Sequence, residues 1–219
     1  MKRLLEGYAH FRSHVFPQHA SLFQQLAHGQ KPNTLFITCS DSRVMPEMLL
    51  QCRPGEVFPI RNAGNFVPAA VETNSGIAGT IEYAVRVLGV RDVVICGHSD
   101  CGAMKAILAK EDLASLPAVS AWLKHAGPSA QWLTQMLEDS SSLSKDQKLR
   151  ILTEANVITQ MHTLTQHPCI ADGLRDKTLD IHAWVFEISD GEVRSYDNER
   201  GIFVPLDRES EDAGDLRVA

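Results

Sequence analysis

The stretch GIAGTIEYAVRVLGVRDVVICG (residues 76–97) holds a helix signal followed directly by a strand signal. In its first half, apolar residues recur with the period of a helix and are followed by a glycine, a common residue just after a helix: Ile77, Ile81, Val85, Leu88 and Gly89. In its second half, the run RDVVIC (91–96) is largely apolar, as in strands buried on both faces. A helix that leads into such a strand predicts a crossover unit of a parallel sheet.

Other strand signals lie on both sides of this unit. TLFIT (34–38) and EVFPI (56–60) are short apolar runs bounded by turn-forming residues. Near the C-terminus, HAWVFEI (182–188) and EVRSYD (192–197) flank Asp190-Gly191, a pair that favours the positive φ angles of a tight hairpin turn. The predicted fold class is α/β, with a central, mostly parallel β-sheet, flanking helices and a C-terminal antiparallel edge hairpin.

The N-terminal residues predict a helical arm. Apolar side chains have helical spacing over residues 2–28 and Gly29 ends the pattern, so the arm is expected to span residues 1–29. We find no internal repeat and no linker, so residues 1–219 are expected to form one domain. The polar residues 210–219 are expected to be a flexible tail.

Two further helices are predicted, over residues 102–110 and 144–166. The segments ILAKEDLASLP (107–117) and GPSA (127–130) are predicted to be irregular.

Composition and charge exclude several classes of partner. The net charge is −6 and the 21 basic residues are not clustered, so nucleic acid and anionic membrane surfaces are not expected to bind. The N-terminal residues 1–16 include Glu6, Gly7, His10 and Arg12 and lack the apolar core of a signal peptide, and no run is long enough to span a bilayer. We therefore expect a cytoplasmic location.

Two of the predicted strands end in chemically reactive side chains. CSDSR (39–43) follows TLFIT, and HSDCG (98–102) follows VVICG. Ligands of parallel sheets bind beyond the carboxyl ends of the strands, so both segments are expected at one edge. Together they supply two thiols, an imidazole and a carboxylate, which is a complete ligand set for zinc: Cys39, Cys101, His98 and Asp41.

Asp41 has two possible roles at such a site. Alternate side chains of an extended chain share a face, so Cys39 and Asp41 can point at the same centre, with Arg43 in reach of the carboxylate. As a fourth ligand, Asp41 closes the metal site and leaves no place for water. Held by Arg43 instead, it leaves that place open and can accept a hydrogen bond from a metal-bound hydroxide.

Other interpretations of the cysteines stay open. The cysteine count is odd and no export signal is evident, which argues against a disulfide framework. Cys39 and Cys101 could form a redox pair, although neither belongs to a C-x-x-C motif, or they could hold a purely structural zinc. The other three cysteines are expected to be buried apolar residues: Cys52, Cys96 and Cys169. The remaining histidines are expected at the surface or in ordinary packing: His10, His14, His19, His28, His125, His162, His167 and His182.

The segments CSDSR and GHSDCG, about sixty residues apart, resemble the signature motifs of the β-class carbonic anhydrases. The intervening EVFPIRNAGNFVP and GTIEYAV resemble other segments of that family, and the likeness extends from Gln30 to about residue 200. The RNAGN segment and the chain length look most like the bacterial form associated with cyanate metabolism.

The resemblance implies a zinc lyase that hydrates CO₂ reversibly to bicarbonate and a proton through attack by a zinc-bound hydroxide. It implies that Cys39, His98 and Cys101 are the zinc ligands and that Asp41 and Arg43 are the catalytic pair. It also implies a homodimer or homotetramer with the active site at the dimer interface.

The resemblance further implies a small apolar CO₂ pocket, with these matching positions: Gln30, Phe58, Ala63 and Tyr83. From the residues alone, Phe58 and Tyr83 could equally be core residues. Gly102 is expected either to offer a backbone N–H close to the metal or to permit tight helix packing.

One departure concerns regulation. Some members of the family bind bicarbonate as an inhibitor through a tryptophan, an arginine and a tyrosine, and the matching residues here are Phe36, Arg61 and Phe186. Two of the three polar contacts are therefore missing, so we expect no strong bicarbonate-regulated site.

Two other functions fit the same residues. One is a hydrolase of a CO₂-like molecule, such as carbonyl sulfide or carbon disulfide. The other is a non-catalytic zinc-binding protein, which the Asp41–Arg43 pair disfavours because a structural site does not need a releasable carboxylate.

Overall fold

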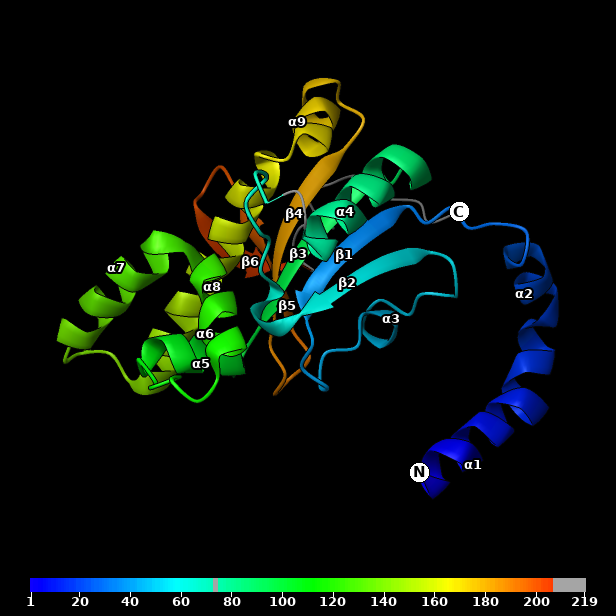
Figure 1. Ribbon diagram of the computed structural model, residues 1–219, viewed down its shortest axis with the longest axis horizontal. Helices are drawn as coiled ribbons and strands as arrows, with labels where there is room; N and C mark the ends of the chain where they lie inside the picture. Colours follow the sequence, from blue (N-terminus) through cyan, green and yellow to red (C-terminus); the bar gives the residue numbers. More distant parts are fainter. Residues whose placement is uncertain (73–74, 207–219) are drawn as a thin grey trace.

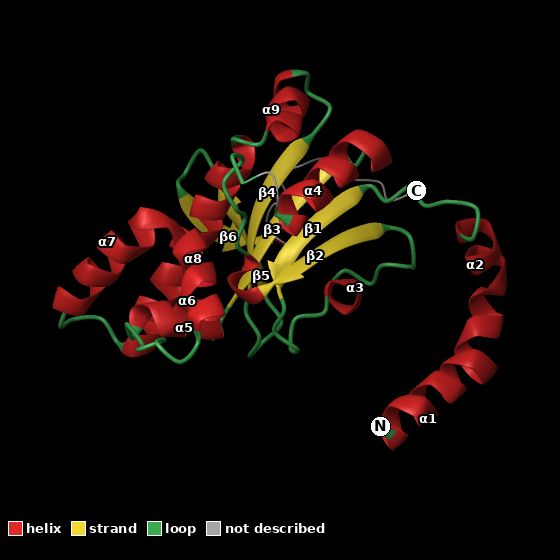
Figure 2. Ribbon diagram, in the orientation of Figure 1, coloured by secondary structure: helices red, strands yellow, loops and turns green. Residues whose placement is uncertain are grey.

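A computed structural model describes residues 1–72 and 75–206 and confirms the predicted fold class (Figures 1 and 2). Six strands form one sheet in the order β2-β1-β3-β4-β5-β6, in which β2, β1, β3 and β4 are parallel and β5 and β6 are antiparallel to their neighbours. The strands are β1 (Thr34–Cys39), β2 (Val57–Asn62), β3 (Asp92–His98), β4 (Asp180–Phe186), β5 (Val193–Asp197) and β6 (Ile202–Pro205).

Helices surround this sheet and extend from it. The α-helices are α1 (Lys2–His10), α2 (Ala20–Leu26), α3 (Pro46–Leu49), α4 (Gly76–Glu82), α5 (Gly102–Leu108), α6 (Pro117–Leu123), α7 (Gly127–Asp139), α8 (Lys145–Thr165) and α9 (Pro168–Arg175). Short π- and 3₁₀-helical segments are η1 (Phe11–Val15), η2 (Phe16–His19), η3 (Ala63–Asn65), η4 (Tyr83–Leu88) and η5 (Lys124–Ala126). In the described residues, no helix is both long enough and apolar enough to cross a membrane.

The two faces of the sheet are covered unequally. On one face the main core packs the strands against α4, η4, α8 and α9, with Ile81 and Val157 fully buried. On the other face Phe36, Val94 and Cys96 form a smaller core, against which Leu49 of α3 packs. The sheet is thus buried on both sides at β1 and β3, as the uninterrupted apolar runs predict.

The ends of the helices follow from local sequence signals. Ser144 and Gln147 form a reciprocal capping box that starts α8. Gly89, with a φ of 69°, ends η4 in the left-handed conformation that glycine adopts without strain.

Arg86 and Arg175 both hydrogen-bond to Asp172 and lower the pKa of its carboxyl group. The Arg86 bond links η4 to α9.

The N-terminal helices form an arm that extends away from the sheet (Figure 1). Neither α1 nor α2 contains a buried residue, and the large side chains Leu4, Leu5 and Tyr8 are 71, 61 and 63% exposed. Phe11, Phe16 and Phe23 pack on one another along the arm.

Two local predictions are corrected, and one strand was missed. GPSA (127–130) is not irregular but begins α7, because Pro128 stands in the first turn, where the missing N–H costs nothing. The Asp190-Gly191 turn is wider than a two-residue hairpin: only Gly191 has a positive φ, and its N–H donates to Glu187 O. The short edge strand β6 was not predicted. The expected tail at 210–219 lies outside the described residues.

Candidate metal centre

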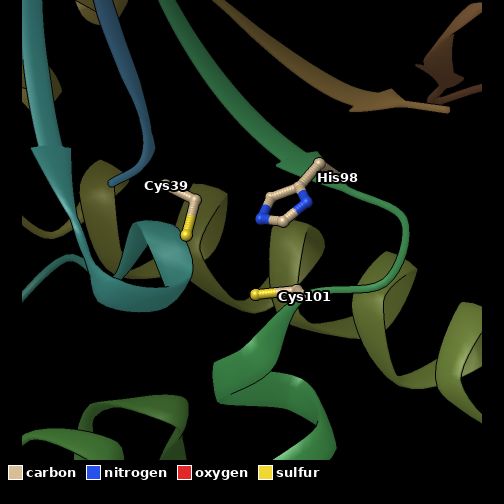
Figure 3. A group of neighbouring side chains, drawn as sticks. All are labelled: Cys39, His98 and Cys101. Carbon is tan, nitrogen blue, oxygen red and sulfur yellow. The ribbon is translucent and has the colours of Figure 1, made fainter. Parts of the chain in front are cut away.

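The parallel sheet brings the two reactive segments together. Cys39 is the last residue of β1 and His98 is the last residue of β3, the strand next to it. Cys101 follows after a short turn as the residue that caps α5. One ligand atom from each of these three buried residues lies within 4.8 Å of the other two, and Figure 3 shows the side chains pointing toward one another.

The turn between His98 and Cys101 is tightly held. Asp100 has a left-handed φ of 60°, which aspartate tolerates better than most residues. Ser99 N–H donates to Phe186 O at 2.9 Å, and Ser99 Oγ accepts a hydrogen bond from Ile188 N–H. These bonds tie the turn to the end of β4 and so fix the direction in which Cys101 points.

His98 has a free ring nitrogen in the buried trio. Its side chain is fully buried, and Nδ1 lies 2.8 Å from Ser99 O. A carbonyl only accepts, so Nδ1 must carry the proton and Nε2 of the neutral ring must present its lone pair. Nε2 is nevertheless a buried atom without a hydrogen-bond partner in the described part of the chain. A metal ion at the centre of the trio would satisfy it.

The two thiols are chemically unequal. The pKa of Cys39 is lowered, chiefly by a hydrogen bond from the Cys101 thiol, with a further hydrogen bond from the backbone N–H of Gly64. The pKa of Cys101 is raised, chiefly because its proton is held by the negative Cys39 sulfur. The Gly64 N–H lies 3.4 Å from Cys39 Sγ. The site therefore already stabilises one thiolate, the form that binds metal.

This donor set fits zinc. Two sulfur atoms and one imidazole nitrogen, all buried, are typical zinc ligands, and a fourth position remains for water or for a carboxylate.

Asp41 lies beside the trio and is held by Arg43. The guanidinium donates from Nε to Oδ1 at 2.9 Å and from Nη2 to Oδ2 at 2.8 Å, and the Arg43 backbone N–H also donates to Oδ1. These bonds lower the pKa of Asp41, so it is ionised at neutral pH. Its Oδ2 lies 4.0 Å from His98 Nε2. The structure thus shows the arrangement in which the carboxylate is bound to Arg43.

Four contacts around this pair were not predicted. Arg43 Nη1 also donates to Asp100 Oδ2 at 2.9 Å, and Lys105 forms an ion pair with the same carboxylate. Arg61 donates to the backbone oxygens of Cys39 and Asp41, at 3.2 and 2.8 Å. Asp100 lies inside the GHSDCG motif, so the sequence indicated that it is close to the site. The sequence did not indicate that its side chain binds Arg43 and Lys105.

Among the expected CO₂-pocket residues, Ala63 and Gly102 adjoin the trio, whereas Phe58, Tyr83 and Gln30 lie away from it within one chain. Phe58 pairs with Leu35, whereas Asn62 pairs with Cys39, so four residues, or about 13 Å, separate Phe58 from the metal end of the sheet. The Tyr83 ring lies 6.1 Å from the Phe58 ring, and exposed Gln30 precedes β1.

The alternative roles of these residues are now distinguishable. Tyr83 is 46% exposed, so it is not a core residue of the single chain, whereas Phe58 packs partly buried against the core. Ala63 is exposed near Cys39. Gly102 has open space where a Cβ would stand, so tight packing does not require glycine there.

The other expected residues have ordinary surroundings. Cys96 and Cys169 are buried as expected, and burial raises the pKa of the Cys96 thiol to about 12, whereas Cys52 is only half-buried. His167 is a buried packing residue beside Pro68 O. Phe36 is fully buried and Phe186 half-buried in the smaller core.

Comparison with known proteins agrees with this geometry. The carbonic anhydrase family model matches residues 34–193. The chain is 44% identical to the carbonic anhydrase of Pseudomonas aeruginosa, over 94% of this chain and 92% of that protein.

Solved structures agree as well. The β-carbonic anhydrase CcaA superposes with a TM-score of 0.86 at 39% identity, covering 94% of this chain and 98% of that one. One of two tetrameric β-carbonic anhydrases from Sordaria macrospora superposes with a TM-score of 0.80 at 26% identity, covering 93% and 98%. The chain therefore belongs to the β class of the carbonic anhydrase family.

Proposed function

We propose that this protein catalyses the reversible hydration of CO₂ to bicarbonate and a proton, with zinc held by Cys39, His98 and Cys101. The observation that carries the proposal is the buried trio, in which His98 Nε2 has no partner among the described residues, beside a carboxylate held by an arginine. When bound, zinc supplies Lewis acidity that makes a water molecule nucleophilic near neutral pH.

In this proposal, Asp41 and Arg43 position the nucleophile. Arg43 keeps the Asp41 carboxylate ionised, so Asp41 accepts a hydrogen bond and does not donate one. An acceptor at this position directs the O–H of the water molecule toward itself and turns an oxygen lone pair toward CO₂. Arg43 holds the carboxylate through two bonds, which limits its rotation.

Asp41 has a second possible position in the same proposal. Its Oδ2 is already 4.0 Å from His98 Nε2, so a small rotation away from Arg43 would make it the fourth ligand and close the site. Arg43 would not then be left unpaired, because Asp100 also accepts from it.

We propose that a second copy of the chain completes the CO₂ pocket. Gln30, Phe58 and Tyr83 lie away from the trio of their own chain, and Tyr83 is exposed. The exposed apolar side chains of the N-terminal arm support association, and one structural relative is described as tetrameric. A homodimer or homotetramer would bring these residues to the partner's metal site, beside Ala63 and Gly102.

Three finer assignments remain proposals. The cyanate-associated subtype is supported only by the RNAGN segment and the chain length. The cytoplasmic location is supported only by the sequence of the N-terminal residues. That residues 1–219 act as one domain is supported by the single continuous sheet.

The test is stopped-flow CO₂ hydration with a pH indicator, on protein whose zinc content has been measured. We expect about one zinc per chain and catalysis at mildly alkaline pH. Zinc-loaded protein that does not accelerate hydration would contradict the proposal. Carbonyl sulfide and carbon disulfide, assayed in parallel, identify the hydrolase, and inactivity on all three identifies a non-catalytic zinc protein.

A further inference from the structure

The peptide between Ala63 and Gly64 connects the metal centre to a helix outside it. Its N–H points at Cys39 Sγ, 3.4 Å away. Its carbonyl, Ala63 O, accepts a hydrogen bond from the indole N–H of Trp122 at 2.8 Å. A peptide unit is planar and rigid, with its N–H and C=O pointing in opposite directions. Trp122 of α6 therefore holds one end of the group whose other end contacts the sulfur.

This peptide lies in an unusual backbone conformation. Gly64 and the next residue, Asn65, are both left-handed, with φ values of 81° and 50°. A Cβ on Gly64 would stand 2.8 Å from the Phe66 ring and 3.0 Å from Ala103 Cβ. Two successive left-handed residues are rare outside turns that are held by other contacts.

Buried carboxamides hold the other side of the same turn. Asn156 Nδ2 donates to Gly64 O at 3.1 Å, and Gln160 Nε2 donates to Asn156 Oδ1 at 3.0 Å. Gln160 Oε1 in turn accepts from Val67 N–H at 2.8 Å. Both side chains are almost completely buried on α8. Asn156 thus holds the Gly64 carbonyl, and Trp122 holds the carbonyl of the Ala63–Gly64 peptide, whose N–H faces Cys39.

We propose that Trp122 is a positioning residue for the metal ligand Cys39, acting through the Ala63–Gly64 peptide. The indole fixes the direction of the Gly64 N–H. It also polarises the peptide, since a carbonyl that accepts a hydrogen bond makes the N–H of the same unit a stronger donor. Hydrogen bonds to a ligand sulfur reduce its electron donation to the metal. The inference rests on the proposed zinc-binding role of Cys39.

The test uses Trp122→Phe, which keeps an aromatic ring against Phe66 and His125 but removes the N–H. The matched control is Trp132→Phe on α7, the same substitution at a side chain that is 67% exposed. Each protein is loaded with Co²⁺ in place of zinc, and the thiolate-to-cobalt charge-transfer absorption is recorded. Zinc affinity is measured by competition with a chromophoric chelator, and unfolding midpoints are recorded for all proteins.

In Trp122→Phe we expect the charge-transfer band at longer wavelength, because a sulfur that loses a hydrogen bond gives up electrons more readily. We also expect zinc to bind about 10-fold more weakly, the effect usually seen when a residue that orients a metal ligand is removed. Trp132→Phe should match the wild type. A folded Trp122→Phe protein with an unshifted band would overturn the proposal, whatever its stability.

A second variant provides an independent test in case Trp122→Phe does not fold. Asn156→Ser is too short to reach Gly64 O, and it should move the band in the same direction. If neither variant folds, the contacts serve the fold and the positioning role is overturned. The metal-binding role of Cys39 fails separately, because wild-type protein would then show no thiolate-to-cobalt band at all, and the proposed reaction fails if zinc-loaded wild-type protein does not accelerate CO₂ hydration.

Discussion

Replacing Gly64 with alanine should destabilise the protein strongly. The structure shows two separate costs. A left-handed φ of 81° costs a residue with a Cβ about 1–2 kcal/mol. The new Cβ would also meet the Phe66 ring at 2.8 Å and Ala103 Cβ at 3.0 Å, and overpacking of this kind costs about 1–3 kcal/mol. Phe66 is fully buried, so moving its ring would disturb the packing around it. We therefore expect the free energy of unfolding to fall by about 2–5 kcal/mol.

The assay is urea unfolding of the zinc-loaded protein, followed by circular dichroism. The matched control is Gly102→Ala at the other side of the metal centre, where a Cβ meets nothing within 4 Å and φ is not left-handed. Its free energy of unfolding should stay within about 1 kcal/mol of the wild type. Equal effects of the two substitutions, or a loss below about 1 kcal/mol for Gly64→Ala, would refute the reasoning.

Three other predictions concern activity and stability. Asp41→Ala and Arg43→Ala should each retain most of the zinc, as measured by metal analysis. Each should lose activity by about 100-fold or more in stopped-flow CO₂ hydration. Wild-type turnover in either variant would remove the pair from the mechanism. Because Phe36 and Phe186 offer no polar group, bicarbonate titration should show no cooperative inhibition, and a cooperative curve would contradict this. The pKa of Asp172 is lowered from its ordinary value of 3.8, so its ion pairs with arginine stabilise the fold above that pH and lose this effect as the pH falls. The unfolding midpoint of Asp172→Asn should therefore lie below that of the wild type at pH 6 and approach it in acid. A difference that is independent of pH would count against the ion pairs.

The sheet and the meeting of Cys39 with His98 could be predicted from the patterns of single strands together with a general rule for parallel sheets. Uninterrupted apolar runs identify β1 and β3, and the rule that ligands lie beyond parallel strand ends then places Cys39 beside His98. The helix signal at 76–88 was equally local, and Gly89 ends it as expected. Nothing beyond residue order was needed for these elements.

The features that were missed depend on contacts between distant segments. GPSA has the composition of a turn, but its proline stands in the first turn of α7, so composition alone did not distinguish a turn from the start of a helix. Trp122 belongs to no motif, and it becomes relevant because α6 places its indole on Ala63. The exposure of Tyr83 could not be predicted either, since an apolar helix face has the same pattern whether it covers its own core or a second chain.

The most direct test of the central claim is X-ray absorption at the zinc edge, on wild-type protein and on Cys101→Ser. The account predicts two sulfur ligands at about 2.3 Å and two nitrogen or oxygen ligands at about 2.0–2.2 Å in the wild type, with zinc lost from the variant. A wild-type spectrum without sulfur ligands, or a variant that keeps its zinc with an unchanged spectrum, would contradict it.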